Sequence, residues 1–349
     1  EWEPQSFIQF TFPHKNGDWT NHYENLVDCF IHIIEKVAQF VKVVVGCENV
    51  LDTQSLFSNR TSFPIHFEKV ISNDIWTRDH GAITILEGDQ PKLLDFTFNG
   101  WGKKFESDLD NKITYTLTNT LFKGLPITNK TFVLEGGSIE SDGKGVLLTT
   151  EKCLLSSTRN SDMNQNQIER FLTRELGLKK ILWLKHGYLI GDDTDAHIDT
   201  LARFCDVDTI AFVKCKNTKD IHFESLKLME EELMNFKDLS GKKYKLVALP
   251  IPDPCYDKKG NRLPATYANF ILVNNGVLVP IYGVKQDQEA VNSLKKIFPE
   301  RTVIGVDCLP IIQQNGSLHC ITMHYPDAVT LNINAVSYTH LTLPTNREV

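Results

Sequence analysis

A cysteine stands directly after a histidine in the segment GSLHCITMHYP, residues 316–326. A thiol attacks carbon only when its pKa is lowered or a base lies nearby. If this segment is an extended strand, His319 and Cys320 point to opposite sides, so His197 is the more useful base. A lone cysteine beside a histidine is more often a buried filler than a nucleophile, and the other polar residues of the chain must decide.

The densest polar segment is GDDTDAHIDTLARF, residues 191–204. His197 and Asp199 would share one face of a strand, and a histidine among carboxylates suits general acid–base chemistry. The alternating acids resemble a calcium loop only faintly, because its sixth position is Ile198 rather than glycine and its twelfth is Phe204 rather than glutamate. A single histidine also supplies too few ligands for a transition metal.

Three more segments place a polar residue at the edge of an apolar run. In NDIWTRDHGAITI, Asp79 precedes a strand and could hold a cation, although it could equally stabilise a turn. In VLEGGSIESDGKGVLLTT, Glu135 ends a strand before two glycines, and an ordinary hairpin with a solvated glutamate is the alternative. In LPATYANFILVNN, Asn269 lies between aromatic residues, where a hydrogen-bonded core asparagine is also reasonable.

These polar positions recur at similar intervals along the chain. The gaps between Asp79, Glu135, His197, Asn269 and Cys320 are 56, 62, 72 and 51 residues. Such spacing predicts a repeated supersecondary unit, each copy of which delivers one polar group to a shared centre.

Strand-like and helix-like runs alternate around these positions. Short β-branched runs predict strands at residues 41–46, 81–86, 130–137, 145–150, 179–184, 208–215, 244–250 and 301–307, with two more within 268–283. Apolar residues at helical spacing predict helices around residues 27–37, 226–236 and 291–298. The tripeptide NNG at 274–276 predicts a tight hairpin turn. No flexible linker interrupts the pattern, which indicates one α/β domain of many short strands.

Composition narrows the class of protein. The chain has 349 residues, 41% of them hydrophobic, and a formal net charge of −7, so it can bury a large core. Its mild acidity argues against nucleic acid or an anionic membrane as a partner, and no bilayer-spanning run or signal peptide is visible. Eight cysteines without C-x-x-C pairs indicate a reduced, cytoplasmic protein.

The two ends of the sequence need separate treatment. The segment VSYTHLTLPT, residues 336–345, is similar to the translation of a sequencing-library adapter. We therefore expect a single domain over residues 1–335 and a non-native tail over residues 336–349. The chain begins at Glu1 rather than methionine, which leaves open an N-terminal leader.

Taken together, the motifs resemble one family. WTRD, LEGGSI, GDDTDAHID, LPATYANF and LHCIT occur here in the order found in agmatine deiminases and the related bacterial-type peptidyl-arginine deiminases, and EWEPQSFIQFTFPH and FNGWGKKF are also similar. The resemblance implies the pentein fold, a pseudo-fivefold α/β propeller of ββαβ modules around a central active site. It also implies a homodimer or larger homo-oligomer and a small guanidino substrate, with no metal or organic cofactor.

The resemblance implies hydrolysis of agmatine to N-carbamoylputrescine and ammonia for polyamine synthesis, through a covalent thiouronium intermediate. The implied catalytic residues are Cys320 as nucleophile, His197 as acid and base, Asp79 and Asp199 as guanidinium ligands, and Glu135 as the partner of His197. The implied substrate-binding residues are Trp76 and Trp101 as apolar walls, Asp193 near the distal amine, and Asn269 near the nucleophile.

The sequence departs from the family pattern at three places around the substrate. Ala196 stands where a glycine is common, Lys103 replaces a second glycine after WG, and QQNGS precedes LHC where a glycine-rich loop is usual. Arginine, free or at a peptide end, is therefore the alternative substrate, and Lys103 and Lys104 are its only hint. A non-catalytic scaffold of the same fold is a third hypothesis, against which the retained catalytic positions argue.

Overall fold

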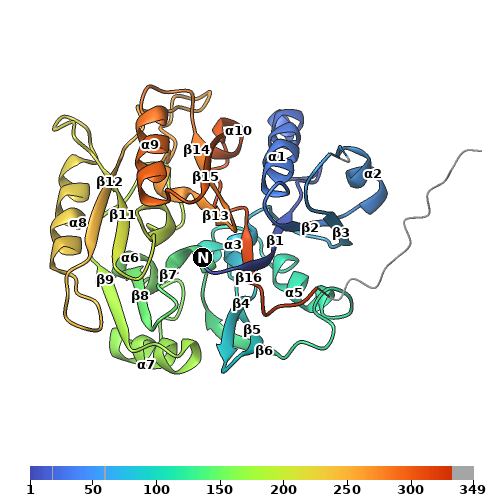
Figure 1. Ribbon diagram of the computed structural model, residues 1–349, viewed down its shortest axis with the longest axis horizontal. Coiled ribbons are helices and arrows are strands. Elements are labelled where there is room, and N and C mark those ends of the chain that lie inside the picture. Colours follow the sequence, from blue (N-terminus) through green and yellow to red (C-terminus); the bar gives the residue numbers. More distant parts are fainter. Residues whose placement is uncertain (18, 59, 332–349) are drawn as a thin grey trace, which may run out of the picture.

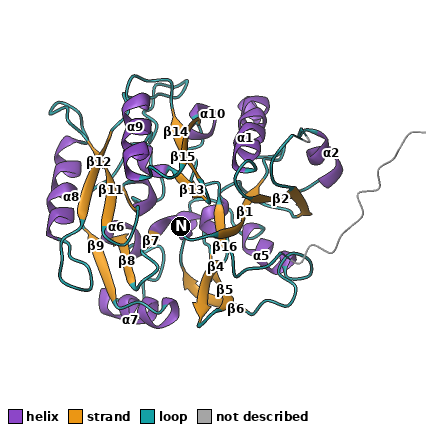
Figure 2. Cartoon of the chain, viewed as in Figure 1, coloured by secondary structure: helices purple, strands orange, loops and turns teal. Residues whose placement is uncertain are grey.

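The computed structural model describes residues 1–17, 19–58 and 60–331. Helices and strands alternate along this part of the chain, and the strands form five small sheets. In Figure 1 and Figure 2 the longer helices lie toward the outside and the strands lie nearer the middle. The fold is therefore mixed α/β, as the alternating sequence pattern predicts.

The bounds of the elements are as follows. The strands are β1 Gln5–Thr11, β2 Lys42–Cys47, β3 Ile65–Lys69, β4 Ile83–Glu87, β5 Gln90–Thr97, β6 Ile127–Val133, β7 Ile139–Ser141, β8 Val146–Thr150, β9 Lys180–Leu184, β10 Ala202–Phe204, β11 Thr209–Lys214, β12 Lys245–Pro250, β13 Ile271–Val273, β14 Gly276–Ile281, β15 Thr302–Asp307 and β16 Met323–Pro326. The helices are α1 Tyr23–Val37, α2 Val50–Ser55, α3 Thr77–His80, α4 Gly100–Lys103, α5 Ile113–Leu117, α6 Glu151–Leu154, α7 Gln165–Leu176, α8 Phe223–Asn235, α9 Asp287–Ile297 and α10 Leu309–Ile312. Short 3-10 helices are η1 Thr20–His22, η2 Asp110–Lys112, η3 Gly136–Ser138, η4 Ile198–Thr200 and η5 Tyr267–Asn269.

All five sheets repeat one pairing pattern. In the sheets β4–β5–β6, β7–β8–β9, β10–β11–β12 and β13–β14–β15, the first two strands are antiparallel and the last two are parallel. In the remaining sheet β16 pairs antiparallel with β1, β1 pairs parallel with β2, and β3 extends the edge. Parallel neighbours need a crossover, and helical segments connect them in each unit. The last described strand thus completes the sheet that the first strand begins.

Local sequence explains the principal helices. The helix α1 buries Phe30, Ile34 and Val37 on one face, which is the spacing of an amphipathic helix. The helix α7 begins with a capping box in which Asn164 and Gln167 bond each other's backbone, and it ends at Gly177 with a left-handed φ of 67°. Among the described residues, no helix combines the length and the apolar character needed to cross a bilayer.

The predicted strands and helices are found, while several short elements were missed. Each apolar run named from the sequence coincides with a strand, the three predicted helices are α1, α8 and α9, and NNG joins β13 to β14. The strands β1, β3, β5, β7, β10 and β16 and the helix α7 were not predicted. The strands β7 and β10 have only three residues each, which is too short for a period-two pattern to register. The predicted tail, residues 336–349, lies outside the described residues.

Candidate active site

The polar positions singled out by their spacing lie in equivalent places of the five units. Each immediately precedes the first strand of its unit: Asp79 in α3 before β4, Glu135 at the start of η3 before β7, His197 and Asp199 at η4 before β10, Asn269 in η5 before β13, and Cys320 in a turn before β16. The sequence interval therefore reflects a structural repeat, and the same turn of each unit carries the polar group.

The five turns contact one another in a ring. The turn α3 contacts η3, η3 contacts η4, and η4 contacts η5. The backbone N–H of His319 donates to the Asn269 carbonyl at 3.2 Å, and the backbone N–H of Arg78 donates to the Cys320 carbonyl at 3.0 Å. The turn that carries Cys320 thus joins η5 back to α3, and residues far apart in sequence share one centre.

Gly137 shows how closely the side chains converge. A Cβ atom at this position would lie 2.7 Å from His197 Nδ1, 2.8 Å from Asp79 Oδ1 and 3.1 Å from Asp199 Oδ2. A side chain cannot fit there, so the second glycine of LEGG allows the backbone to approach all three groups.

A cavity opens onto this centre. Its lining residues are Asp74, Trp76, Asp79, Trp101, Phe105, Asp192, Asp193, Thr194, His197, Thr200, Gln314, Asn315, Gly316 and Cys320. The lining combines aromatic rings with carboxylates and contains no lysine or arginine. Such a cavity suits a cationic ligand with an apolar segment.

Cys320 is buried at the centre, with 7% of its surface exposed. Its Sγ atom lies 3.7 Å from Asp199 Oδ2 and 3.5 Å from Asn269 Oδ1. Burial raises the pKa of the Cys320 thiol well above its usual value, and the charges of Asp199 and Asp79 raise it further. The thiol is therefore protonated at neutral pH unless a cation enters the site.

Asp79 and Asp199 are two buried acids with different surroundings. Asp79 accepts hydrogen bonds from Trp101 Nε1 and from the Gly137 backbone N–H, each at 2.9 Å, while burial raises its pKa. Asp199 Oδ2 lies 2.7 Å from His319 Nδ1. Burial opposes its ionisation, but His319 lowers the pKa of Asp199 overall. Its other oxygen, Oδ1, has no hydrogen-bond partner among the described residues.

His197 lies beside these acids and lines the same cavity as Cys320. Its Nδ1 is 3.7 Å from Asp79 Oδ1. Burial alone would lower the pKa of His197, but Asp79, Cys153 and Glu135 outweigh it and raise the pKa well above its usual value. His197 is therefore an imidazolium that can give a proton to a leaving group and take one back afterwards.

Glu135 has a partner that the sequence did not predict. Its Oε1 accepts a hydrogen bond from Arg159 Nε at 3.0 Å, in place of the expected direct bond to His197, whereas Oε2 is buried without a partner among the described residues. Arg159 also donates to the Thr194 carbonyl at 2.9 Å and to the Asp195 carboxylate. The guanidinium group of Arg159 thus ties Glu135 to the loop that leads into His197.

Asn269 supports the nucleophile through the backbone. Its Oδ1 accepts from the His319 N–H at 2.8 Å and lies 3.4 Å from the Cys320 nitrogen, and its Nδ2 donates to the Asp199 carbonyl at 3.2 Å. It is fully buried and is not among the residues that line the cavity. Asn269 is thus both a hydrogen-bonded core asparagine and a residue near the nucleophile, because its hydrogen bonds also position Cys320.

The remaining predicted residues line the cavity. The Trp76 ring packs against the backbone of Gly316, where a Cβ atom would lie 2.2 Å from the ring, and Trp101 packs edge-on against Phe105. Asp193 accepts a hydrogen bond from Asn315 Nδ2 at 3.4 Å. Burial raises the pKa of Asp193 to about 6.

Two local predictions were wrong. The segment around His197 is not a strand, because Asp195 and Ala196 have left-handed φ values of 69° and 64° and Asp192 Oδ2 accepts the Ala196 N–H at 2.7 Å. The backbone therefore turns into η4, and its side chains reach the centre from a turn. Cys320 likewise lies in a turn that ends before β16.

Sequence reasoning also missed charged residues behind the site. Arg159 comes from SSTRN, a segment without a recognisable pattern, and His319 was set aside as pointing away. The structure places the His319 ring between Asp199 and Glu1. All eight cysteines lie in the described part of the chain and are free thiols.

Comparison with known proteins gives a consistent set of relatives. The sequence model for the Porphyromonas-type peptidyl-arginine deiminase matches residues 1–326. The chain is 41% identical to C. jejuni agmatine deiminase, solved as a cysteine-to-serine variant with substrate bound, with a TM-score of 0.88 over 93% of this chain and 94% of that one. It is 29% identical to the agmatine deiminase of Medicago truncatula, over 93% of this chain and 95% of the relative.

Two further structures are similar. A crystal structure described provisionally as a peptidyl-arginine deiminase is 44% identical, with a TM-score of 0.90 over 93% of this chain and 97% of that one. A dimethylarginine dimethylaminohydrolase adduct with S-methyl-L-thiocitrulline is only 12% identical, yet it superposes with a TM-score of 0.52 over 92% of this chain and 100% of that one. The second likeness concerns the fold alone.

Proposed function

The chain belongs to the Porphyromonas-type peptidyl-arginine deiminase family, and we propose that it is an agmatine deiminase. In this proposal it hydrolyses the guanidinium group of agmatine to give N-carbamoylputrescine and ammonia. The observation that carries the proposal is the buried Asp199 carboxylate, whose Oδ2 lies 3.7 Å from Cys320 Sγ while its Oδ1 has no partner among the described residues. Glu135 Oε2, beside His197, is likewise buried without a partner in that part of the chain. Buried carboxylate oxygens without partners are costly, and a guanidinium group supplies the N–H donors that they lack.

Binding follows from the same groups. Asp79 and Asp199 would accept charge-assisted hydrogen bonds from the guanidinium nitrogens and orient its carbon toward Cys320 Sγ. The positive charge of the substrate would offset the repulsion that Asp79 and Asp199 exert on a thiolate. The substrate itself therefore helps to ionise the nucleophile, which stays protected as a thiol in its absence.

The reaction then needs a place for each proton. As the guanidinium binds, the Cys320 thiol releases its proton to solvent; the thiolate attacks the guanidinium carbon and forms a C–S bond, and His197 gives its proton to the departing nitrogen, so that the C–N bond breaks and ammonia leaves. Water attacks the resulting thiouronium and gives one proton back to His197, and the C–S bond breaks as the sulfur takes the second proton, which restores the thiol and releases the ureido product. Cys320, His197 and water carry every bond change.

The cavity favours agmatine over arginine. Agmatine ends in an ammonium group, which Asp193 could meet with its carboxylate, whereas the α-carboxylate of arginine would face the acids of the lining. Of the two lysines named from the sequence, Lys104 is engaged elsewhere, because its Nζ bonds Asp195 Oδ1 at 3.0 Å and also the Asp193 carbonyl. Arginine, free or at a peptide end, is therefore the second candidate.

The test compares substrates directly. The purified protein is assayed for ammonia with agmatine, free arginine and a peptide ending in arginine. We expect turnover of agmatine with kcat/KM at least 100-fold above that for the other two, and an absence of agmatine turnover would refute the proposal. Cys320→Ser should reduce turnover below detection. Cys255 is a buried cysteine outside the cavity lining, so Cys255→Ser should retain turnover. A fully active Cys320→Ser variant would disprove the nucleophile assignment.

The same proposal covers the arrangement of the five units, the oligomeric state and the cellular location. The five units of one pairing pattern support a pentein arrangement, a pseudo-fivefold propeller with the five turns around the centre, within a single domain that ends by residue 335. We also propose a homodimer or larger homo-oligomer in the cytoplasm. Sedimentation of the purified protein tests the oligomeric state, and a monomer at assay concentration would contradict it.

A further inference from the structure

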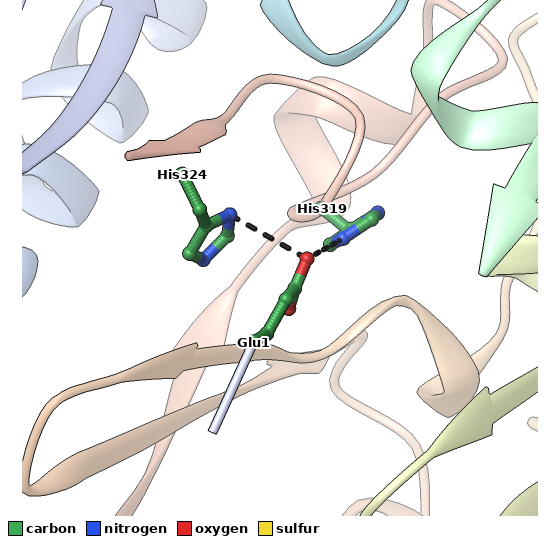
Figure 3. A group of neighbouring side chains, drawn as sticks. All are labelled: Glu1, His319 and His324. Atoms are coloured by element: carbon green, nitrogen blue, oxygen red, sulfur yellow. Dashed lines mark hydrogen bonds and ion pairs between the residues drawn. The ribbon is translucent and has the colours of Figure 1, made fainter. Parts of the chain in front are cut away.

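A buried chain of charged groups extends from Asp199 away from Cys320. The His319 side chain is 1% exposed, and its two ring nitrogens meet two carboxylates: Nδ1 lies 2.7 Å from Asp199 Oδ2, and Nε2 lies 2.6 Å from Glu1 Oε1. Figure 3 shows the His319 ring and His324 on the two sides of the Glu1 carboxylate. A neutral imidazole carries only one N–H, so bonds to both carboxylates require an imidazolium.

The far end of this chain is firmly held. Glu1 Oε2 bonds Arg203 Nη2 at 2.7 Å, and Glu1 Oε1 lies 3.2 Å from Arg78 Nη2 and 3.5 Å from His324 Nδ1. Although burial raises the pKa of Glu1, the guanidinium charges of Arg203 and Arg78 help to lower it well below its usual value. Glu1 is therefore a fixed anion against which His319 can be anchored.

A metal ion is the alternative occupant of this cluster. The ligand atoms of Glu1, His319 and His324 lie within 4.8 Å of one another. However, Arg78 Nη2 lies 2.5 Å from His324 Nδ1, so the lone pair of that nitrogen is already used. The guanidinium charges of Arg78 and Arg203 would also repel a cation. An ion-pair network therefore explains the cluster better than a metal site does.

We propose that His319, anchored by Glu1, is a positioning residue for the deimination reaction. It holds Asp199 through Oδ2, so that Oδ1 remains free for the guanidinium, and its charge reduces the repulsion between Asp199 and the Cys320 thiolate. The inference rests on the proposed function of the site. It adds Glu1 to the residues on which the reaction depends.

The geometry explains why a small change here would matter. Asp199 Oδ2 is shared between His319 Nδ1 at 2.7 Å and Cys320 Sγ at 3.7 Å. If His319 is lost, the Asp199 carboxylate can rotate and accept the thiol proton, which removes the free oxygen from the substrate. A displacement of about 1 Å in a reacting group can cost about 100-fold in rate.

Two substitutions separate the two ends of the imidazole. In His319→Asn the amide nitrogen takes the place of Nδ1 and keeps the bond to Asp199, whereas in His319→Gln the amide nitrogen reaches the place of Nε2 and keeps only the bond to Glu1. We expect kcat/KM for agmatine to fall about 10-fold in His319→Asn and about 100-fold in His319→Gln. The KM should rise more in His319→Gln, since Asp199 contacts the substrate.

A matched control accounts for the loss of a buried histidine as such. His222 is 2% exposed and lies 2.8 Å from Asp220 through Nδ1, outside the cavity lining. We expect His222→Asn to change kcat/KM less than threefold. If the two His319 variants lose activity equally and only in proportion to their loss of folded protein, His319 has a merely structural role and the proposal fails.

A second measurement does not depend on agmatine. Alkylation of Cys320 by iodoacetamide, followed by mass spectrometry from pH 7 to 10, reports the thiolate. The groups that surround His319 are Asp199, Glu1, Glu140, His324, Arg78 and Arg203. Loss of the imidazolium leaves Asp199 less compensated, so both variants should alkylate at least threefold more slowly at pH 8. Wild-type rates in both variants would overturn the proposal, and a wild-type protein inactive on agmatine would refute only the proposed function.

Discussion

Replacing Arg159 by methionine should destabilise the protein strongly and inactivate it. The side chains of Arg159 and Glu135 are both 0% exposed, and their Nε–Oε1 distance is 3.0 Å. Methionine fills much of the space of arginine but leaves the Glu135 carboxylate buried without its cation. The substitution also removes the bonds from Arg159 to Thr194 and Asp195, which hold the loop before His197.

The expected magnitude follows from this burial. Breaking a fully buried ion pair from one side costs about 3–5 kcal/mol, because an uncompensated charge remains. Unfolding entropy is about 2.1 cal/mol/K per residue, or roughly 0.7 kcal/mol/K for 349 residues. The loss therefore corresponds to a decrease in Tm of about 4–7 °C.

A double-mutant cycle tests this reasoning. The free energy of unfolding is measured by urea titration for the wild type, Arg159→Met, Glu135→Gln and the double variant. The double variant should be about 2–3 kcal/mol more stable than Arg159→Met, because glutamine carries no charge to leave uncompensated. It should remain inactive, since Glu135 is part of the site. A single variant that costs less than about 1 kcal/mol, or additive effects in the cycle, would show that the pair is not what stabilises Glu135.

Three further predictions concern the cavity and its loops. Since burial raises the pKa of Asp193 to about 6, its carboxylate is ionised above that pH and neutral below it, so kcat/KM for agmatine should fall as the pH drops through 6. The variant Asp193→Asn should lose this pH dependence and have a kcat/KM about 10-fold lower. An alkylguanidine without an amine should show neither effect. Trp101→Phe removes the donor to Asp79 and should lower kcat/KM for agmatine about 10-fold, and an unchanged value would contradict a role for that hydrogen bond. Lys103 has a φ of 67°, so Lys103→Gly should raise the free energy of unfolding, measured by urea titration, by up to about 1 kcal/mol. The control Lys227→Gly, on the exposed side of α8, should lower it by about 1 kcal/mol. If both variants lose the same free energy of unfolding, backbone strain at Lys103 is excluded.

The sequence analysis described the local structure of the candidate site residues poorly. The directions of the Cys320, His197 and Asp199 side chains were considered on the assumption of strands, yet these residues lie in turns or at a 3-10 helix. The choice of these residues rests on side-chain chemistry and spacing, which do not depend on the local element, whereas the predicted directions of their side chains rest on a period of two, which does. Tertiary contacts decided the turn, since Asp192 binds the Ala196 N–H and Asn269 binds the His319 N–H.

Charged partners could not be predicted from spacing. Glu1 and His319 are separated by 318 positions and meet at 2.6 Å, because β16 pairs with β1 and brings both ends of the described chain together. Arg159 reaches Glu135 from a loop between α6 and α7. Which residues form such buried ion pairs depends on the strand topology. From a single sequence, the topology can be predicted only as far as the strands themselves are recognised. The missed strands β1 and β16 are therefore also the reason that the Glu1–His319 contact was missed.

The backbone around the substrate explains the three departures from the family pattern. Lys103 and Ala196 occupy places where glycine is usual, and Asn315 lies in a loop that is usually glycine-rich; the three have left-handed φ values of 67°, 64° and 65°. The loops thus keep a conformation that glycine adopts freely, although non-glycine residues pay about 1–2 kcal/mol for it. Contacts hold them there, since Asp192 binds the Ala196 N–H at 2.7 Å and the side chain of Asn315 lies 3.4 Å from Asp193. A change of residue at these places therefore need not imply a change of loop shape. We propose that substrate selection depends instead on the side chains that the loops present, foremost the acid of Asp193.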